Sequence, residues 1–217
     1  MILACKDIKP LLMERAKNDP DLNKLSFYLY SDKDSMPSFF YLKGIKKVLT
    51  DLNIPFTEGF LDKKAKLEDN LKAFKEATLG HFVILARPLG IDYENEFLSL
   101  IDPKYDPDMM TLINKGKLYS GDLNYLPATA SGVREILKYF SLDISGKSCL
   151  VVGRSLTVGL PLAELVNQSN GALTLVHSHI SPSLMNTYAK NADYIFLATG
   201  RPGLIARNSL SKNKVVI

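Results

Sequence analysis

The sequence predicts an α/β protein in which an N-terminal α/β domain precedes a domain built on a doubly wound parallel sheet. Two observations carry this prediction. In the second half, short apolar segments alternate with helix-sized segments, which is typical of parallel strands joined by crossover helices. Within that half, residues 147–161 hold an apolar strand that breaks at Gly153 into a turn, with a helix from about Gly159. We place the domain boundary near Leu126, which gives domains 1–126 and 127–217.

The first half also reads as alternating strands and helices, although its strand order is not evident. Ser38 is expected to cap a helix that ends near Asn53. The segment from Arg87 to Gly90 contains proline and glycine and should stop the preceding strand. We expect strands at residues 24–31 and 81–86, a return to the sheet at residues 54–60, helices at residues 38–52, 61–77 and 94–101, and a loop-rich segment at residues 102–121.

The pattern is more regular in the second half, because each apolar segment is followed by a segment of helical length. We expect helices at residues 132–140, 159–168 and 182–191, and strands at residues 149–152, 172–176, 194–198 and 215–217.

Composition narrows the class of protein. The chain has 217 residues and a net charge of +4 that is spread along the sequence, which is a poor argument for nucleic acid. Cys5 and Cys149 lie far apart, so a reducing, cytoplasmic environment is expected. No signal peptide is visible, and no apolar run approaches the ~20 residues that span a membrane. Three histidines without ligand spacing argue against a metal site.

The turn after the strand at residues 149–152 indicates a nucleotide site. A strand that breaks at glycine into a helix lets backbone N–H groups meet a phosphate. The spacing departs from G-x-G-x-x-G, because Ser155 stands where the second glycine would be. The next strand ends without an acidic residue to bind a ribose 2′-hydroxyl, and Arg154 is placed to contact a phosphate, so NADP is favoured over NAD. The alternatives are a surface arginine at Arg154 and ordinary polar strand-end residues at His177 and His179.

Separated segments carry a resemblance to one family. In the second half they are residues 126–132, residues 152–161, the pairs His177-Ser178 and Ala192-Asp193, and residues 198–203. Upstream they are Ser38-x-x-Tyr41, Pro88-Leu89, Asp106-x-Asp108 and Asn114-x-Gly116-x-Leu118. Together, over residues 28–217, they resemble the bifunctional methylenetetrahydrofolate dehydrogenase/methenyltetrahydrofolate cyclohydrolase family. The resemblance implies a Rossmann-like second domain and oxidation of a tetrahydrofolate derivative with NADP in one-carbon metabolism.

The resemblance also implies a cofactor site and a substrate site. A pterin would lie over Tyr41 and be fixed by Asp108, which are the two expected catalytic residues, beside the turn at Pro88 and Leu89. The alternative for Asp108 is a loop-capping residue, and for Tyr41 a core residue. The nicotinamide would lie near the turn that begins at Thr199. The expected cofactor-binding residues are Gly153, Arg154, Ser155, Val158, Gly159, Pro161, His177, Ser178, Thr199, Gly200, Arg201 and Pro202.

Two expected catalytic groups are replaced. The family has a lysine one helical turn after the tyrosine, where this chain has Ile45, and a glutamine where it has Ala86. Lys43, Lys46 and Lys47 lie on other helix faces, and the family's glycine–phenylalanine is Met109-Met110. Hydride transfer needs mainly alignment of two rings, whereas hydrolysis of the methenyl group needs polar groups that manage water and protons. We therefore expect dehydrogenase activity to persist and cyclohydrolase activity to be weak or absent.

The end of the sequence carries a further expectation. The family continues with a glycine-rich loop and a helix, whereas this sequence stops at Ile217 within an expected strand, so it is either incomplete or naturally short. A naturally short chain would expose apolar surface, which predicts a homodimer. Two alternatives stay open: a non-catalytic relative that binds nucleotide or folate, and another two-domain NADP dehydrogenase of the shikimate dehydrogenase kind.

Overall fold

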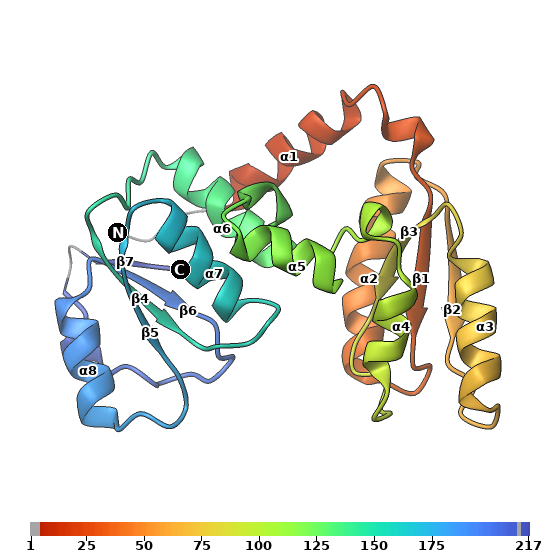
Figure 1. The fold of residues 1–217 in the computed structure, drawn as a ribbon. Coiled ribbons are helices and arrows are strands. Elements are labelled where there is room, and N and C mark those ends of the chain that lie inside the picture. Colours follow the sequence, from red (N-terminus) through yellow and green to blue (C-terminus); the bar gives the residue numbers. More distant parts are fainter. Residues whose placement is uncertain (1–4, 212–213) are drawn as a thin grey trace. The chain divides into compact units, whose positions relative to one another are not determined.

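The computed structural model describes residues 5–211 and 214–217 (Figure 1). The chain divides into two compact units. One comprises Lys9–Lys115, and the other comprises Gly116–Ile217 together with the start of the chain up to Ile8. The predicted boundary between residues 126 and 127 falls later in the chain than this division, and it stays a prediction.

The unit Lys9–Lys115 is built on a three-stranded parallel sheet in the order β2-β1-β3 (Figure 1). Each strand is followed by a helix, as parallel pairing requires. The strands are β1 (Phe27–Ser31), β2 (Phe56–Phe60) and β3 (Phe82–Leu85), and the helices are α1 (Ile8–Lys17), α2 (Met36–Asp51), α3 (Leu67–Ala77), α4 (Glu94–Leu100) and α5 (Leu112–Tyr119). Helix α1 begins one residue before this unit, and α5 continues past its end.

Alternate residues of β1 enter two different apolar clusters, one on each face of this sheet. Tyr30 packs with Phe74 of α3 and Phe97 of α4, whereas Leu29 packs with Leu42 and Leu49 of α2. Burial on both faces explains why the central strand reads as an almost continuous apolar run.

The second unit contains a four-stranded parallel sheet in the order β5-β4-β6-β7. Its most buried strand is β4, whose residues Cys149, Leu150 and Val151 have no exposed surface. The strands are β4 (Ser148–Val152), β5 (Ala172–Val176), β6 (Tyr194–Leu197) and β7 (Val215–Val216), and the helices are α6 (Ala128–Tyr139), α7 (Gly159–Gln168) and α8 (Pro182–Asn191).

Helices cover both faces of this sheet. Val151 packs in one cluster with residues of α6 and α7, and Leu150 packs in another with Met185 of α8. A parallel sheet with crossover helices on both faces is the doubly wound, Rossmann-like arrangement. The predicted fold class is therefore confirmed.

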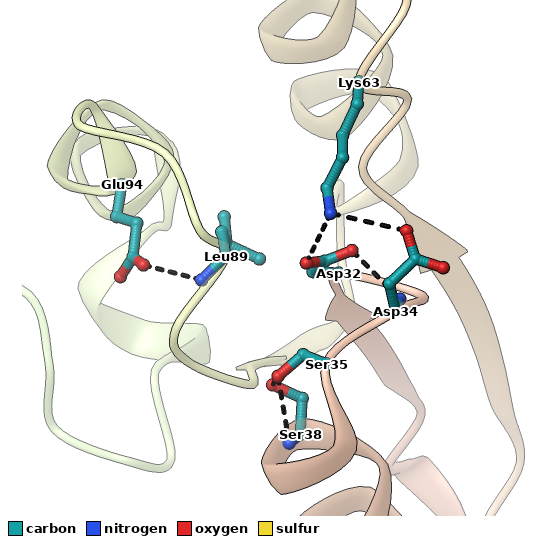
Figure 2. Close-up of polar contacts among 7 residues, drawn as sticks. All are labelled: Asp32, Asp34, Ser35, Ser38, Lys63, Leu89 and Glu94. Atoms are coloured by element: carbon teal, nitrogen blue, oxygen red, sulfur yellow. Dashed lines mark hydrogen bonds and ion pairs between the residues drawn. The ribbon is translucent and has the colours of Figure 1, made fainter.

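Three helix starts differ from the sequence prediction, and one of them is that of α6, which begins at Ala128 and not at residue 132. Helix α2 begins before Ser38, because the hydroxyl of Ser35 accepts a hydrogen bond from the Ser38 N–H (3.4 Å) and Pro37 is tolerated in the first turn (Figure 2). Helix α3 begins at Leu67 and not at residue 61. The side chain of Asn70 bonds both the N–H (3.0 Å) and the carbonyl of Asp62 (2.9 Å), and these bonds hold the preceding loop.

Helices α1 and α5 were not predicted. The start of α5 is organised by the buried carboxylate of Asp106, which accepts hydrogen bonds from the N–H groups of Met110 (3.0 Å) and Thr111 (2.7 Å). These two local hydrogen bonds give helical order to a segment that contains Asn114 and Gly116, two residues with low helix propensity. The segment reads as a loop in sequence for that reason.

Within the described residues, no helix is long and apolar enough to cross a membrane. The same residues contain no group of three or more histidine, cysteine or acidic side chains suited to a metal ion.

Candidate functional site

The turn after β4 is shaped by two glycines. Gly153 has a φ of +123°, and a Cβ at this position would lie 2.5 Å from the carbonyl oxygen of Ala198. A Cβ on Gly159 would overlap the carbonyl group of Gly153. The ends of β4 and β6 and the start of α7 therefore approach so closely that no side chain fits between them.

Ser155 closes this turn. Its hydroxyl accepts hydrogen bonds from the N–H groups of Val158 (3.2 Å) and Gly159 (3.3 Å) at the start of α7. Val158 packs against the core, and Pro161 is buried in the first turn of the helix. These residues set the position of the helix N-terminus, which is the positive end of the helix dipole.

A hollow of about 270 Å³ opens at the carboxyl ends of β4, β5 and β6. Its polar lining comes from three strand ends: Arg154 after β4, His177 and Ser178 after β5, and Thr199 and Arg201 after β6. Gly153 also lines it. The rest of the wall is apolar and consists of Val152, Ile180, Pro182, Met185 and Leu204.

The charged side chains that line this hollow are all positive. Arg154 and Arg201 line it, and no carboxylate does. Six of the twelve expected cofactor-binding residues are brought together here, and Arg201 shares the wall with Arg154. The apolar wall was not predicted, because Ile180, Met185 and Leu204 carry no motif and meet only in the folded sheet.

In the unit Lys9–Lys115, the two expected substrate residues are in contact. The hydroxyl of Tyr41 on α2 donates to the carboxylate of Asp108, at 3.0 Å and 3.2 Å from its two oxygens. Burial raises the pKa of Asp108, the bond from Tyr41 opposes that shift, and the charge of Asp106 adds to it. Burial and the adjacent Asp108 carboxylate also raise the pKa of Tyr41. The phenol therefore remains protonated and able to donate.

The loop that carries Asp108 is held by Asp106. This carboxylate is 3% exposed, and besides the two backbone bonds at the start of α5 it accepts one from the Asn114 side chain (3.0 Å). Met109, which follows Asp108, has a φ of +54°, a conformation that favours glycine. The family resemblance places a glycine at this position, the residue that this conformation favours.

The turn after β3 contains a cis peptide bond between Arg87 and Pro88. Glu94 at the start of α4 supports the turn by accepting hydrogen bonds from the N–H of Leu89 (2.6 Å) and the side chain of Arg87 (2.6 Å) (Figure 2 shows the first). The Leu89 side chain is fully buried in the core of this unit. A role in substrate binding for Pro88 and Leu89 stays a prediction. Because the Leu89 side chain is buried, only its backbone could contact a substrate.

The two replaced positions share one apolar environment. Ala86 is fully buried and Ile45 is partly buried, and both belong to the cluster formed by Leu29 and α2. The amine of neighbouring Lys46 is engaged with the carboxylate of Glu58 (3.1 Å), so it does not replace the lysine expected at position 45.

A parallel sheet with a glycine turn, cations and an apolar hollow at its carboxyl edge defines the nucleotide-binding class of α/β proteins. Residues 127–217 match the family model of the tetrahydrofolate dehydrogenase/cyclohydrolase NAD(P)-binding domain.

Curated relatives extend the match to nearly the whole chain. The bifunctional protein FolD of Clostridium acetobutylicum is 32% identical over 208 residues, covering 94% of this chain and 73% of the relative. FolD of Staphylococcus epidermidis is 32% identical and covers 100% of this chain and 78% of the relative. The chain therefore belongs to the FolD family of bifunctional methylenetetrahydrofolate dehydrogenase/cyclohydrolases, as the sequence motifs predicted.

Solved structures agree in fold. The bifunctional FolD enzyme of Campylobacter jejuni superposes with a TM-score of 0.88 at 22% identity, covering 97% of this chain and 78% of that chain. A FolD structure from Trypanosoma brucei, complexed with NADP cofactor and an inhibitor, gives a TM-score of 0.87 at 19% identity and covers 100% of this chain and 77% of that one.

Proposed function

We propose that this protein catalyses the NADP-dependent oxidation of 5,10-methylenetetrahydrofolate to 5,10-methenyltetrahydrofolate in one-carbon metabolism. The observation that carries the proposal is the hollow at the carboxyl edge of β4, β5 and β6, with Arg154 and Arg201 on its wall and no carboxylate. Solved structures of the same fold carry the dehydrogenase name along with the cyclohydrolase name.

The residues of the hollow fit NADP. Its apolar wall suits an adenine ring, its guanidinium groups suit phosphate, and the start of α7 suits the pyrophosphate. No acidic side chain on the wall would repel a 2′-phosphate, which favours NADP over NAD. The cofactor supplies the chemistry of the reaction by accepting a hydride, and the protein supplies binding and alignment.

On the substrate side, Tyr41 and Asp108 hold the pterin. Because the Tyr41 hydroxyl already donates to the Asp108 carboxylate, this carboxylate is oriented as an acceptor before substrate arrives. The amino edge of a pterin presents paired N–H donors that match a carboxylate, and the tyrosine ring offers a stacking surface. Both residues therefore fix the orientation of the substrate ring.

The second family reaction, hydrolysis of the methenyl group, is weak in this protein. It depends on groups that position water and transfer protons. The two positions where the family resemblance places such groups, Ile45 and Ala86, lie in an apolar cluster that offers neither an amine nor an amide. Dehydrogenase activity is less affected, because aligning two rings requires no proton-transfer group at these positions.

The test is to assay the purified protein for both steps. We expect NADP-dependent formation of methenyltetrahydrofolate and slow hydrolysis of that product. The double variant Ile45→Lys/Ala86→Gln should accelerate hydrolysis by on the order of 10²-fold, because it restores a proton-transfer group and a polar partner. Val48→Lys adds an amine to the same cluster one turn further from Tyr41 and serves as the control. Rapid hydrolysis without dehydrogenase activity in the unmodified protein would contradict the proposal.

We further propose that the protein is a homodimer that works in the cytoplasm. Strand β5 lies at the edge of its sheet, and its residues Leu173 and Leu175 are 39% and 36% exposed. Exposed apolar residues on an edge strand favour association with a second copy. Cys149 is a free, buried thiol, which suits a reducing compartment.

A further inference from the structure

Met109 holds a backbone conformation that its side chain opposes. Its φ of +54° lies in the left-handed region, where a Cβ crowds the following carbonyl oxygen. Asparagine tolerates this region, and Asn53 and Asn170 adopt it here as well. Among the non-glycine residues with a positive φ in the described part of the chain, Met109 is the only apolar one. The sequence therefore keeps a methionine where glycine would fit with less strain.

The surrounding loop imposes this conformation. The Met109 N–H donates to the carbonyl oxygen of Asp106 (3.3 Å), and the Asp106 carboxylate accepts hydrogen bonds from the N–H groups of Met110 (3.0 Å) and Thr111 (2.7 Å). The backbone on both sides of Met109 is thus tied to one buried residue. Rotation to a relaxed φ would break these bonds, so the strain stays.

The Met109 side chain is not used in the core. Its neighbour Met110 is 7% exposed and packs in the apolar cluster that contains Tyr30 and Phe97. Met109 is partly exposed, and none of the apolar clusters formed by the described residues includes it. Core packing therefore does not account for a methionine at this position.

Met109 directly follows a residue of the substrate site. The carboxylate of Asp108 accepts the hydrogen bond from the Tyr41 hydroxyl (3.0 Å). Because the α carbons of consecutive residues are about 3.8 Å apart, the side chain of Met109 begins next to the group that would bind the edge of a pterin. A methionine thioether is flexible and polarizable, and it makes favourable contacts with aromatic rings.

We propose that the Met109 side chain packs against the pterin ring of the substrate, and that this contact is the reason why the strained methionine is kept. The inference rests on the proposed function and deepens it by adding a residue to the substrate site beside Tyr41 and Asp108. Strained backbone persists at ligand sites where the surrounding structure holds it in place. The glycine that the family resemblance places here would supply the backbone conformation without this contact.

The test removes the side chain with Met109→Gly in the full chain. The thermal midpoint of unfolding should stay unchanged or rise by a few degrees, because relief of strain offsets the extra freedom of glycine in the unfolded chain. Anaerobic calorimetry should show tetrahydrofolate binding weakened by about 10-fold, the effect of losing one contact between a thioether and a ring. The loss should be equal for tetrahydropteroate, which has the ring but lacks the glutamate.

Two further variants serve as controls. Met109→Leu keeps an apolar side chain of similar volume and should weaken tetrahydrofolate binding less than about 3-fold. Ser141→Gly relieves a similar conformation, a φ of +51°, at an exposed position in the other unit. It should move the thermal midpoint in the same direction as Met109→Gly and change tetrahydrofolate binding less than about 2-fold, because the two positions are independent.

Unchanged tetrahydrofolate binding in Met109→Gly overturns the inference. A lowered thermal midpoint also overturns it, because the side chain would then pack in the fold. A loss seen with tetrahydrofolate and not with tetrahydropteroate overturns it too, since the contact would be to the glutamate. In each of these cases the proposed function stands if the unmodified protein oxidises methylenetetrahydrofolate. If the unmodified protein binds no tetrahydrofolate, the proposed function fails as well.

Discussion

At the scale of single residues, the loop after β1 depends on one lysine. Asp32 is 8% exposed, and the Lys63 amine lies 2.8 Å from its carboxylate and 3.4 Å from that of Asp34 (Figure 2). The bond from Lys63 is the largest cause of a lowered pKa for Asp32. This contact joins the loop that leads into α2, the helix of Tyr41, to the loop after β2.

Replacing Lys63 with methionine should lower the thermal midpoint of unfolding by a few degrees at neutral pH, because a largely buried carboxylate loses its partner. A pKa that is lower in the folded protein than in the unfolded chain stabilises the fold above the ordinary aspartate value of about 3.9, and this contribution is lost as the pH falls through the folded value. The difference between variant and parent should therefore shrink below about pH 4.

Thermal unfolding followed by circular dichroism across that pH range measures the effect. Lys64→Met is the control, since the exposed neighbouring residue has no recorded ion pair in the described part of the chain. If the difference in thermal midpoint between variant and parent stays constant down to pH 3, the apolar part of the lysine side chain, and not its ion pair, stabilises the fold.

At the scale of elements, the junction of β4, β6 and α7 fixes the geometry of the hollow. The backbone of Gly153 meets Ala198 on one side and Gly159 on the other. These are backbone contacts, which side-chain rotation does not relieve. The position of the β4 end that bears Arg154 is therefore fixed relative to the N-terminus of α7.

Gly159→Ala should destabilise the protein by about 1–3 kcal/mol, because its Cβ would overlap the Gly153 carbonyl group and force the backbone apart. It should also weaken NADP binding. Gly132→Ala in α6 is the matched control, since a Cβ there meets nothing within 4 Å. In a helix this second change should stabilise by about 0.5–1 kcal/mol. Urea unfolding measures the free energy of unfolding of both variants. Equal values for the two would refute the claim that the backbone at Gly159 leaves no room for a Cβ.

At the scale of the whole molecule, β5, the outer strand of the four-stranded sheet, offers a surface suited to a second copy. Leu173 and Leu175 pair in register with Cys149 and Val151 of β4, so they share the sheet face on which Val151 packs against the helices α6 and α7. They are nevertheless partly exposed. Because β5 lies at the edge of the sheet, its outer backbone groups are also available for pairing.

Leu173→Asp/Leu175→Asp should convert the dimer to a monomer, because two charges would be buried in the interface. Sedimentation velocity measures the outcome. Leu79→Asp, which changes a leucine that is 72% exposed in the other unit, should leave the dimer unchanged. A protein that sediments as a monomer before any substitution would exclude the proposed assembly.

The class of fold and the family were predictable from the sequence alone. The bounds of α7, β5 and α8 agree with the predicted bounds, because in this half the apolar periodicity, the glycine at the turn and the proline at the helix start all indicate the same elements. The family motifs also predicted that Tyr41 and Asp108 serve one site, whereas the hydrogen bond between them was not predicted.

Tertiary structure decided the rest. The helix α5 depends on the buried carboxylate of Asp106, and the shared apolar environment of Ile45 and Ala86 depends on α2 packing against the sheet. The meeting of Arg154 and Arg201 in one hollow depends on the adjacency of β4 and β6. In the last two cases the groups are far apart along the chain, and only helix packing and sheet order bring them together, so no local pattern records the contact. The bonds of Asp106 span only four and five residues, but they depend on burial of its carboxylate.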